Sequence, residues 1–389
     1  MIKVLQINKL YYPETGGVER IVQQLAEGLK DRMDMKVLVC RRKGRTLIEE
    51  VNGIEVCRTS SFGMAFSMPV SLSFFNYFRK AVKDRDIIHI HMPFPLADIA
   101  VALYRYRGKI VLWWHSDILR QKFFLALYKP FMRGLLRCAD TIMVATQAHI
   151  DNSDFLPEFR DKCVVIPFGV KANDKNKYWE SHEGSDRNEY RESHEGSDKN
   201  KYRESHAGSD SDAVVILFVG RLVYYKGCEI LLEAFGKITG ARLRIVGSGV
   251  LEDKLKRISA NFSNKVDFLG NISDEEVARE FSDCDIFVLP SVEKTEAFGI
   301  VQIEAMSQGK PVINTKLPSG VPLVSLDGLT GITVPPSDVQ SLAEAMQKLV
   351  DNKELRLEYG RNAYKRAIEE FSESVMLDRV FKQYESLVK

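Results

Sequence analysis

The stretch VVILFVGRLVYYKGCEILLEAFGKI, residues 214–238, changes from one hydrophobic pattern to another within a few residues. Its first part, VVILFVG, is an unbroken apolar run of the kind that forms a strand buried in a parallel sheet. Its last part, CEILLEAFGKI, has the apolar spacing of an amphipathic helix. Arg221 and Lys226 lie between the two. Because two cations before a helix oppose its dipole unless an anion joins them, this loop predicts a phosphate site.

Both halves of the chain repeat this alternation of short apolar strands and amphipathic helices. In the first half we predict strands at KVLQIN, KVLVC, IIHIHM, IVLWWH, TIMVAT and CVVIPF, and in the second at VVILFVG, RLRIVG, VDFLG, IFVLP and PVINT. Strands that alternate with helices form parallel sheets covered on both faces. The predicted fold class is therefore α/β, with two doubly wound Rossmann-like domains that bind ligands at the carboxyl ends of their strands.

Three twelve-residue repeats, DKNKYWESHEGS, DRNEYRESHEGS and DKNKYRESHAGS, separate the two halves at residues 174–209. They contain almost no aliphatic residues, so this block is predicted to be a disordered linker. Its histidines have no fixed ligand geometry, and we assign no metal to them. The predicted boundaries are 1–173 for the first domain, 174–212 for the linker and 213–373 for the second domain, with a last helix at about 374–389.

The composition is typical of a globular protein long enough for two cores, since 45% of the 389 residues are hydrophobic. The six cysteines are scattered without metal-ligand spacing, which favours reduced thiols in the cytoplasm. The start, MIKVLQIN, reads as a strand rather than a leader peptide, and no apolar run predicts a membrane span. Residues 1–173 hold 26 Lys and Arg against 17 Asp and Glu, so we expect the first domain to face something anionic.

Two glycine-containing loops follow predicted strands. Gly16 and Gly17 precede the helix VERIVQQLAEGL, where backbone N–H groups can approach an anion closely. Gly247 and Gly249 lie in VGSGVLED, but Glu252 stands where a dinucleotide fingerprint has its third glycine. This substitution argues against a nicotinamide or flavin cofactor.

Three D-x-D triplets are present, and a metal-dependent sugar transferase binds its divalent ion with such a pair. Two of them adjoin the starts of predicted strands and the third lies in the linker, so we assign no metal to any of them. They are Asp84/Asp86, Asp210/Asp212 and Asp283/Asp285.

The stretch TEAFGIVQIEAM, residues 295–306, keeps two acids at the start of an otherwise apolar helix. Glu296 precedes the helix and Glu304 follows about two turns later, and each costs desolvation unless something pairs with it. The N–H groups of Phe298, Gly299 and Ile300 are among the unpaired donors of the first turn. Since Glu304 can accept hydrogen bonds from the vicinal hydroxyls of a ribose, the two acids predict a nucleotide-sugar site.

Together these residues resemble the retaining glycosyltransferases of family 4, which have the GT-B fold. The resemblance covers nearly all of the chain outside 174–209 and includes GGVERIVQQLAEGL, WHSDI, VIPFGV, FVGRLVYYKG, IVGSG, FLGNIS, LPSVEKTEAFGIVQIEAMSQGKPVI and DGLTGITVPPSD. Its most specific part is the E-x7-E pair enclosing FG, with GRL followed by KG. It implies two domains that face each other across a cleft, and a last helix that returns to the first domain.

The resemblance also implies a role for each matching residue. Arg221 and Lys226 match the cations at the donor diphosphate, and Glu304 matches the ribose-binding acid. Glu296 matches the acid at the transferred sugar, beside the backbones of Phe298, Gly299 and Ile300. Gly16 and Gly17 match a loop that closes over the donor, whereas Gly247, Gly249, Asn271 and Ile272 match loops around the base. His115 matches a histidine that assists catalysis; without the resemblance it could equally be a core histidine at a strand end.

Within the family, WHSDILRQKFFLALYKPF and LPSGVPLVSLDGLTGITVPPSD resemble the subgroup that builds bacterial O-antigen and capsule polysaccharides. This implies mannose from GDP-mannose as the donor sugar, with a UDP-sugar as the alternative, and no required metal or cofactor. The implied acceptor is a lipid-linked glycan at the inner face of the cytoplasmic membrane, and no nucleic acid is expected to bind.

Basic and aromatic residues alternate in the segment 120–137, which could lie on anionic lipid. The alternative for that segment is a helix packed on its own sheet. Two other functions stay open for the whole chain: a nucleotide-sugar 2-epimerase, and a scaffold that binds a nucleotide-sugar without turning it over.

Overall fold

The computed structural model describes residues 1–14, 16–65, 68–104, 106–115, 122–171, 213–260, 262 and 265–389, with no side chains described for 122–127. These residues divide into two compact units. The first comprises 1–171, 318–323 and 369–389, and the described part of the second comprises 213–317 and 324–368. The repeat block 174–209, for which a disordered linker is predicted, lies outside the described residues.

The first unit is built on an eight-stranded sheet with the strand order β10-β9-β8-β7-β1-β2-β4-β3. All neighbouring strands are parallel except β3 and β4. The strands are β1 (Lys3–Ile7), β2 (Asp34–Cys40), β3 (Leu47–Val51), β4 (Ile54–Thr59), β7 (Ile87–Met92), β8 (Lys109–Trp114), β9 (Thr141–Val144) and β10 (Cys163–Val165). A separate two-stranded sheet pairs β5 (Met64–Ala65) with β6 (Met68–Pro69).

The antiparallel edge corrects the prediction of a wholly parallel first sheet. Strands β3 and β4 form a hairpin whose turn is Asn52-Gly53, both with positive φ. Asn-Gly between two strand-like runs is a strong hairpin signal, and it explains this antiparallel pair. The edge strand β3 exposes most of its residues, so it lacks the continuous apolar run that marked the central strands.

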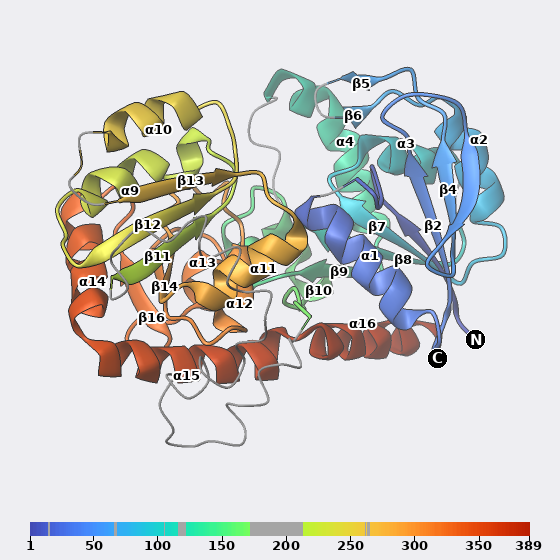
Figure 1. Cartoon of the computed structure of the whole chain (residues 1–389). Coiled ribbons are helices and arrows are strands. Elements are labelled where there is room, and N and C mark those ends of the chain that lie inside the picture. Colours follow the sequence, from blue (N-terminus) through green and yellow to red (C-terminus); the bar gives the residue numbers. More distant parts are fainter. Residues whose placement is uncertain are drawn as a thin grey trace. The chain divides into compact units, whose positions relative to one another are not determined.

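Helices of the first unit are α1 (Gly17–Leu29), α2 (Ser73–Ala81), α3 (Pro95–Tyr104), α4 (Lys122–Cys138), α5 (Gln147–Asp151), the 3₁₀ helix η1 (Leu156–Lys162) and α16 (Glu373–Val388). The last helix packs beside α1 (Figure 1). Arg32, just beyond α1, forms a 2.6 Å ion pair with Asp378 of α16. Tyr384 of the same helix is completely buried. The carboxyl end of the chain therefore belongs to the first unit.

The second unit is built on a wholly parallel six-stranded sheet with the order β13-β12-β11-β14-β15-β16. The strands are β11 (Val214–Val219), β12 (Ala241–Val246), β13 (Val266–Gly270), β14 (Ile286–Leu289), β15 (Val312–Thr315) and β16 (Gly331–Val334). Helical segments are η3 (Tyr224–Lys226), α9 (Cys228–Phe235), α10 (Glu252–Ser259), α11 (Asp274–Asp283), α12 (Ile300–Met306), α13 (Val321–Val324), α14 (Val339–Asp351) and α15 (Lys353–Phe371). The boundary after residue 368 falls within α15. Strand β16, only four residues long, was not predicted.

Each unit has its own hydrophobic core between sheet and helices. In the first, Ile90, Leu112 and Trp114 pack with helix residues such as Phe74. In the second, Phe218, Ile245 and Val288 pack with α9 and α14. Among the helices in the described residues, none has the length and apolar character needed to cross a membrane.

Candidate active site

The second sheet has one topological switch point, between β11 and β14. The chain continues from β11 to β12 and β13 on one side, and then resumes with β14, β15 and β16 on the other. In open parallel sheets ligands bind outside the carboxyl ends of the two strands at such a point. The loop after β11 carries Arg221 and Lys226, and the loop after β14 carries Glu296. The predicted phosphate and sugar residues therefore lie at the switch point.

These two loops, residues 220–227 and 290–299, are called the donor loops below, and their backbones are packed tightly together. Gly227 has φ +70°, and a Cβ atom there would lie 2.0 Å from the carbonyl oxygen of Pro290. The backbone N–H of Val292 donates to the carbonyl of Tyr225 at 2.8 Å. The glycine of the sequence motif KG is thus required because the two loops leave no room for a side chain.

Lys226 and Glu296 form an ion pair across the donor loops. The distance from Lys226 Nζ to Glu296 Oε2 is 2.5 Å, and the two side chains are only 12% and 11% exposed. The hydroxyl of Ser291 also donates to Glu296 Oε2, at 3.3 Å. The sequence predicts that a bound sugar compensates the burial of Glu296. The structure shows that Lys226 also compensates part of this desolvation cost.

Two tyrosines line the same loops and were not singled out from the sequence. Arg221 Nη2 donates to the Tyr225 hydroxyl at 2.8 Å, and Lys226 Nζ lies 5.9 Å from the centre of the Tyr225 ring. The Tyr224 hydroxyl donates to Glu293 at 3.1 Å. Tyr225 therefore contacts both predicted phosphate cations, a position that its place in VYYKG could have suggested.

The remaining residues of the TEAFG stretch surround the start of α12. Phe298 is buried, and Gly299 is the N-cap residue of the helix with φ +73°. Ile300 begins the helix, so Phe298 precedes the first turn and does not belong to it, although the sequence predicts that it does; Glu304 is half-buried within the helix. The fold thus places Glu304 in the helix that follows Glu296, as the spacing of the two acids predicts.

Gly247 and Gly249 have a structural reason that does not involve a ligand. A Cβ atom on Gly247 would lie 2.1 Å from the carbonyl oxygen of Gly220, and one on Gly249 would lie 2.3 Å from that of Leu222. The N–H of Gly247 also donates to the Gly270 carbonyl at 2.8 Å. The loops after β11, β12 and β13 are therefore held together, and Asn271 and Ile272 follow directly at the end of β13.

The first sheet has its own switch point, between β1 and β7, and the loop after β1 leads to Gly16 and Gly17 at the start of α1. Gly16 is the N-cap residue, with an extended backbone and no side-chain cap. The buried Arg58 of β4 holds this loop, because its guanidinium donates to the carbonyls of Tyr11 and Tyr12. No local sequence pattern predicts this support.

His115 lies directly after β8 and is 8% exposed. Its ring is nearly parallel to the rings of Trp113 and Phe168, with centroids 6.0 and 5.4 Å away. The His115 Nε2 atom is 2.9 Å from Nδ1 of His91, at the end of β7. Beyond His91 lies His89, whose ring is stacked on it at 4.7 Å. We call these three histidines with Trp113 and Phe168 the histidine stack.

Burial keeps the imidazoles of the histidine stack uncharged. The pKa of His115 is lowered well below its ordinary value by burial and then by the neighbouring charge of His91, and burial lowers the pKa of His91 in the same way. Burial lowers the pKa of His89 to about 3. At neutral pH a His115 without charge can accept or donate a proton through its ring nitrogens.

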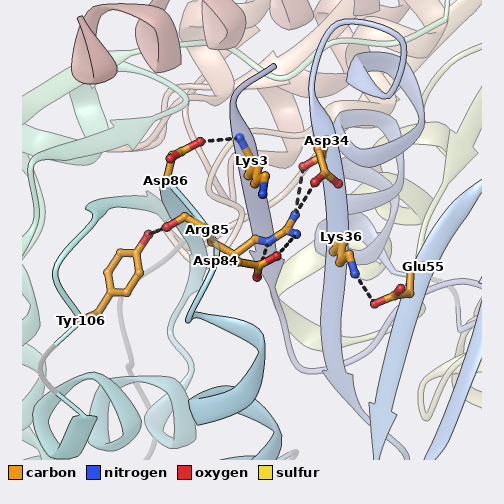
Figure 2. Close-up of polar contacts among 8 residues, drawn as sticks. All are labelled: Lys3, Asp34, Lys36, Glu55, Asp84, Arg85, Asp86 and Tyr106. Atoms are coloured by element: carbon orange, nitrogen blue, oxygen red, sulfur yellow. Dashed lines mark hydrogen bonds and ion pairs between the residues drawn. The ribbon is translucent and has the colours of Figure 1, made fainter.

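The aspartates of the first D-x-D triplet are engaged in structural contacts at the opposite, amino-terminal ends of the strands (Figure 2). Asp84 forms a 2.9 Å ion pair with the buried Arg85, which also lies 3.1 Å from Asp34. Asp86 accepts a hydrogen bond of 2.8 Å from the backbone N–H of Lys3. Within the described residues, no group of three or more His, Cys, Asp or Glu is arranged to hold a metal ion.

Comparison with known proteins gives two family matches. The family model "Glycosyltransferase Family 4" matches residues 15–174, and the model "Glycosyl transferases group 1" matches residues 198–366. The chain is 31% identical to O-antigen chain mannosyltransferase C of Escherichia coli, over 100% of this chain and 99% of that protein. It is also 31% identical to the D-rhamnosyltransferase WbpZ of Pseudomonas aeruginosa, over 93% and 90% of the two chains.

A solved structure shows the same fold. The crystal structure of Anabaena HepE in complex with UDP aligns with a TM-score of 0.74 and 20% identity, covering 99% of this chain and 100% of that one. The GT-B fold predicted from the sequence is therefore confirmed. Since similarity to the mannosyltransferase extends along both whole chains, the protein belongs to the family 4 glycosyltransferases, enzymes that bind a nucleotide-sugar donor and a glycan acceptor.

Proposed function

We propose that this glycosyltransferase transfers a manno-configured sugar, mannose from GDP-mannose, to a lipid-linked glycan in the synthesis of O-antigen or a related surface polysaccharide. The observation that carries the proposal is the full-length similarity to a mannosyltransferase of O-antigen chains. The second relative is named for D-rhamnose, which is D-mannose without its 6-hydroxyl. Two relatives with the same sugar configuration support a site selective for the axial 2-hydroxyl.

The donor loops supply the electrostatics that the reaction needs. As the bond from the anomeric carbon to the nucleoside diphosphate breaks, negative charge grows on the departing phosphate oxygen. The cations Arg221 and Lys226, which both contact Tyr225, are suited to stabilise that charge. We therefore propose that transfer needs no metal ion, and we expect turnover to be unchanged by a chelator.

Glu296 and Glu304 complete the proposed donor site. Glu296 is paired with Lys226. Its carboxylate can therefore accept hydrogen bonds from the hydroxyls of a sugar whose diphosphate binds to Lys226. Glu304 lies in the following helix and is assigned to the ribose, and the glycine loops 247–249 and 270–272 are assigned to the base. The acceptor hydroxyl attacks the face from which the diphosphate departs, which retains the anomeric configuration, with His115 assisting near the sugar.

Contact with an anionic membrane is proposed for the first unit on the basis of its charge and of α4. The structure uses part of α4 for internal packing, because Met132, Leu135 and Leu136 are buried and Arg133 pairs with Glu158. Phe131 is 45% exposed on the same helix. Co-sedimentation of the whole protein with anionic and with neutral liposomes tests the proposal; equal, negligible binding to both would remove it.

The donor is tested by a thermal-shift panel of GDP, UDP, ADP and dTDP, followed by the matching sugar nucleotides. A ligand that binds the folded protein raises its apparent stability with the logarithm of saturation. We expect stabilisation by GDP and GDP-mannose, and the Lys226→Met variant as a control without it. A response to UDP alone would overturn the proposed donor in favour of a UDP-sugar. Comparing GDP-mannose with GDP-D-rhamnose then shows whether the site requires the 6-hydroxyl.

Turnover is tested with GDP-mannose and a lipid-linked glycan extract, and the product linkage is identified by NMR. An α-linked mannose from the α-linked donor supports retention, whereas a β-linkage would contradict it. The same assay without acceptor addresses the 2-epimerase alternative, because an epimerase would release the C2 epimer from donor alone.

A further inference from the structure

His115 is the end of a continuous hydrogen-bonded chain inside the first unit. Its Nε2 atom is 2.9 Å from His91 Nδ1, and His91 Nε2 is 2.8 Å from Oε1 of Gln6. The amide nitrogen of Gln6 donates to the Tyr384 hydroxyl at 3.0 Å. The chain therefore joins four elements: the ends of the neighbouring strands β7 and β8, the central strand β1, and the C-terminal helix α16.

The direction of this chain follows from its acceptors. An amide oxygen only accepts hydrogen bonds, so His91 must donate to Gln6 from Nε2. A neutral imidazole carries one proton, which leaves Nδ1 of His91 as an acceptor. His115 must then donate from Nε2, and its own Nδ1 is left without a proton. Burial keeps the pKa of both histidines low, so this neutral arrangement persists at physiological pH.

We propose that His91 is a positioning residue, which holds the proton of His115 on Nε2 and leaves Nδ1 as the nitrogen that accepts. This inference rests on the proposed role of His115 in sugar transfer. His91 has no second task that explains its polarity, since both of its ring nitrogens are used within the chain. Gln6 sets the orientation of His91, and Tyr384 holds Gln6 in turn.

The stacked rings fix the remaining freedom of His115. The planes of the His91 and His115 rings are inclined by 14° to each other, and the planes of Trp113 and Phe168 are inclined by 11° and 15° to that of His115. With the plane fixed by stacking and the tautomer fixed by His91, a single ring nitrogen is available for substrate. A wrong tautomer presents a donor in place of an acceptor, which impairs catalysis without preventing binding.

The first test reads the tautomer directly in the wild-type protein. Two-bond ¹H–¹⁵N spectra of the [¹⁵N]histidine-labelled chain distinguish protonated from bare ring nitrogens, and the His115 signals are assigned as those missing from His115→Ala. We expect His115 to be neutral with its proton on Nε2 at pH 7. A proton on Nδ1, or a charged ring, would overturn the inference without any measurement of activity.

The second test separates positioning from structure by three variants. His91→Phe keeps a stacked ring but offers no acceptor, so we expect kcat to fall about 10–100-fold while the donor KM stays within a factor of about three. His91→Asn keeps an oxygen where Nδ1 stood, and we expect it to recover most of the lost kcat. Asp98→Asn is the control: it changes a buried polar residue of the same unit that, among the described residues, bonds to Tyr128 and not to the histidine chain, and kcat should be unchanged.

A folded His91→Phe variant with wild-type kcat would overturn the role of His91, as would an equal loss of kcat in Asp98→Asn. If His91→Phe does not fold, His91→Asn and the wild-type spectra still decide. The His115→Ala variant separates the proposed role of His115 from the inferred role of His91. Wild-type turnover in His115→Ala would remove the proposed role of His115 itself, whereas a loss there combined with full activity of His91→Phe would contradict only the inference about His91.

Discussion

Lys226 and Glu296 lie 2.5 Å apart across two loops that follow neighbouring strands of one parallel sheet. Each residue is assigned to a different part of the donor, the cation to the diphosphate and the acid to the sugar. Their pairing means that each of these two charges already has a partner before a ligand binds. A donor that binds there exchanges one set of charge-assisted contacts for another, and no buried charge is left alone at any stage.

Lys226→Met should therefore destabilise the ligand-free protein, because Glu296 is left nearly buried without its cation. We expect the Lys226→Met variant to lose about 1–3 kcal/mol of unfolding free energy. Adding Glu296→Gln to this variant should cost less than Glu296→Gln costs in the wild-type protein. A double-mutant cycle from chemical denaturation measures this coupling. The control is Lys348→Met on the exposed side of α14, which should change stability by less than about 0.5 kcal/mol. Additive losses from the two site variants would show that the pair is not coupled.

Gly227→Ala should separate the donor loops. The new Cβ atom would collide with the Pro290 carbonyl at 2.0 Å, in addition to the strain of a positive φ. Gly240→Ala is a matched control in the same unit, with φ +74° but its nearest contact at 3.5 Å. We expect Gly240→Ala to lose about 1 kcal/mol and to keep stabilisation by the nucleotide, whereas Gly227→Ala loses more and responds no longer. Equal losses and equal nucleotide responses would refute the steric explanation.

Those loops were predictable because parallel sheets bring the ends of their strands to one edge. The unbroken apolar runs at β11 and β14 placed Arg221, Lys226 and Glu296 after strands, and this was sufficient to predict that the three residues lie at one edge of the sheet. Their mutual contact was not predictable, since two further strands separate β11 from β14 along the chain and the strand order has to be known first. The contact between Arg58 and the loop after β1 was missed for the same reason.

Part of the histidine stack is predictable from the sequence. His89 and His91 are two residues apart in the strand IIHIHM, so they must point to the same face of the sheet. Two imidazoles on one buried face need hydrogen-bond partners. The segment WWHSDI at the end of the neighbouring strand supplies one, His115. The contact of Phe168 with His115 is predictable only if the order of β8, β9 and β10 is known. The contact of Tyr384 with Gln6 is predictable only if the position of α16 is known. Neither is encoded in local sequence pattern.

The buried His89 should make the first unit sensitive to acid. Burial lowers its pKa from 6.5 to about 3 in the folded protein. Between these values the unfolded chain binds a proton that the folded chain does not, so stability is complete above pH 6.5 and is lost as the pH falls. His89→Phe lacks this proton uptake. Relative to wild type, it should therefore gain about 1.5 kcal/mol between pH 6.5 and pH 5.

The measurement is urea denaturation of both proteins, followed by the fluorescence of the buried Trp113 and Trp114. A Trp179→Phe background removes the third tryptophan, which lies in the repeat block. Burial is the largest cause of the lowered pKa of His91, His115 and His149, and it acts in both proteins, so most of their contribution cancels in the difference. A stability difference that is constant from pH 8 to pH 5 would show that His89 is not held neutral by the fold.

Asp98 should produce the opposite pH dependence in the same unit. This residue of α3 is buried, it accepts a hydrogen bond from the Tyr128 hydroxyl of α4, and its Oδ1 atom has no hydrogen-bond partner among the described residues. Burial raises the pKa of Asp98 from 3.8 to about 7. Between these values the folded protein holds a proton that the unfolded chain has lost, so stability is complete below pH 3.8 and is lost as the pH rises towards 7.

Asp98→Asn is neutral at every pH and should therefore become progressively more stable than wild type from pH 4 to pH 7, by at most about 1.4 kcal/mol per pH unit. Tyr128→Phe should act in the other direction, because it removes the donor that helps to hold the ionised carboxylate, and its loss of stability should be larger at pH 8 than at pH 5. The same fluorescence-monitored denaturation, in the Trp179→Phe background, measures both variants. If the advantage of Asp98→Asn is already complete at pH 4, the Asp98 carboxyl is ionised in the fold and α3 and α4 are joined by a charged contact instead.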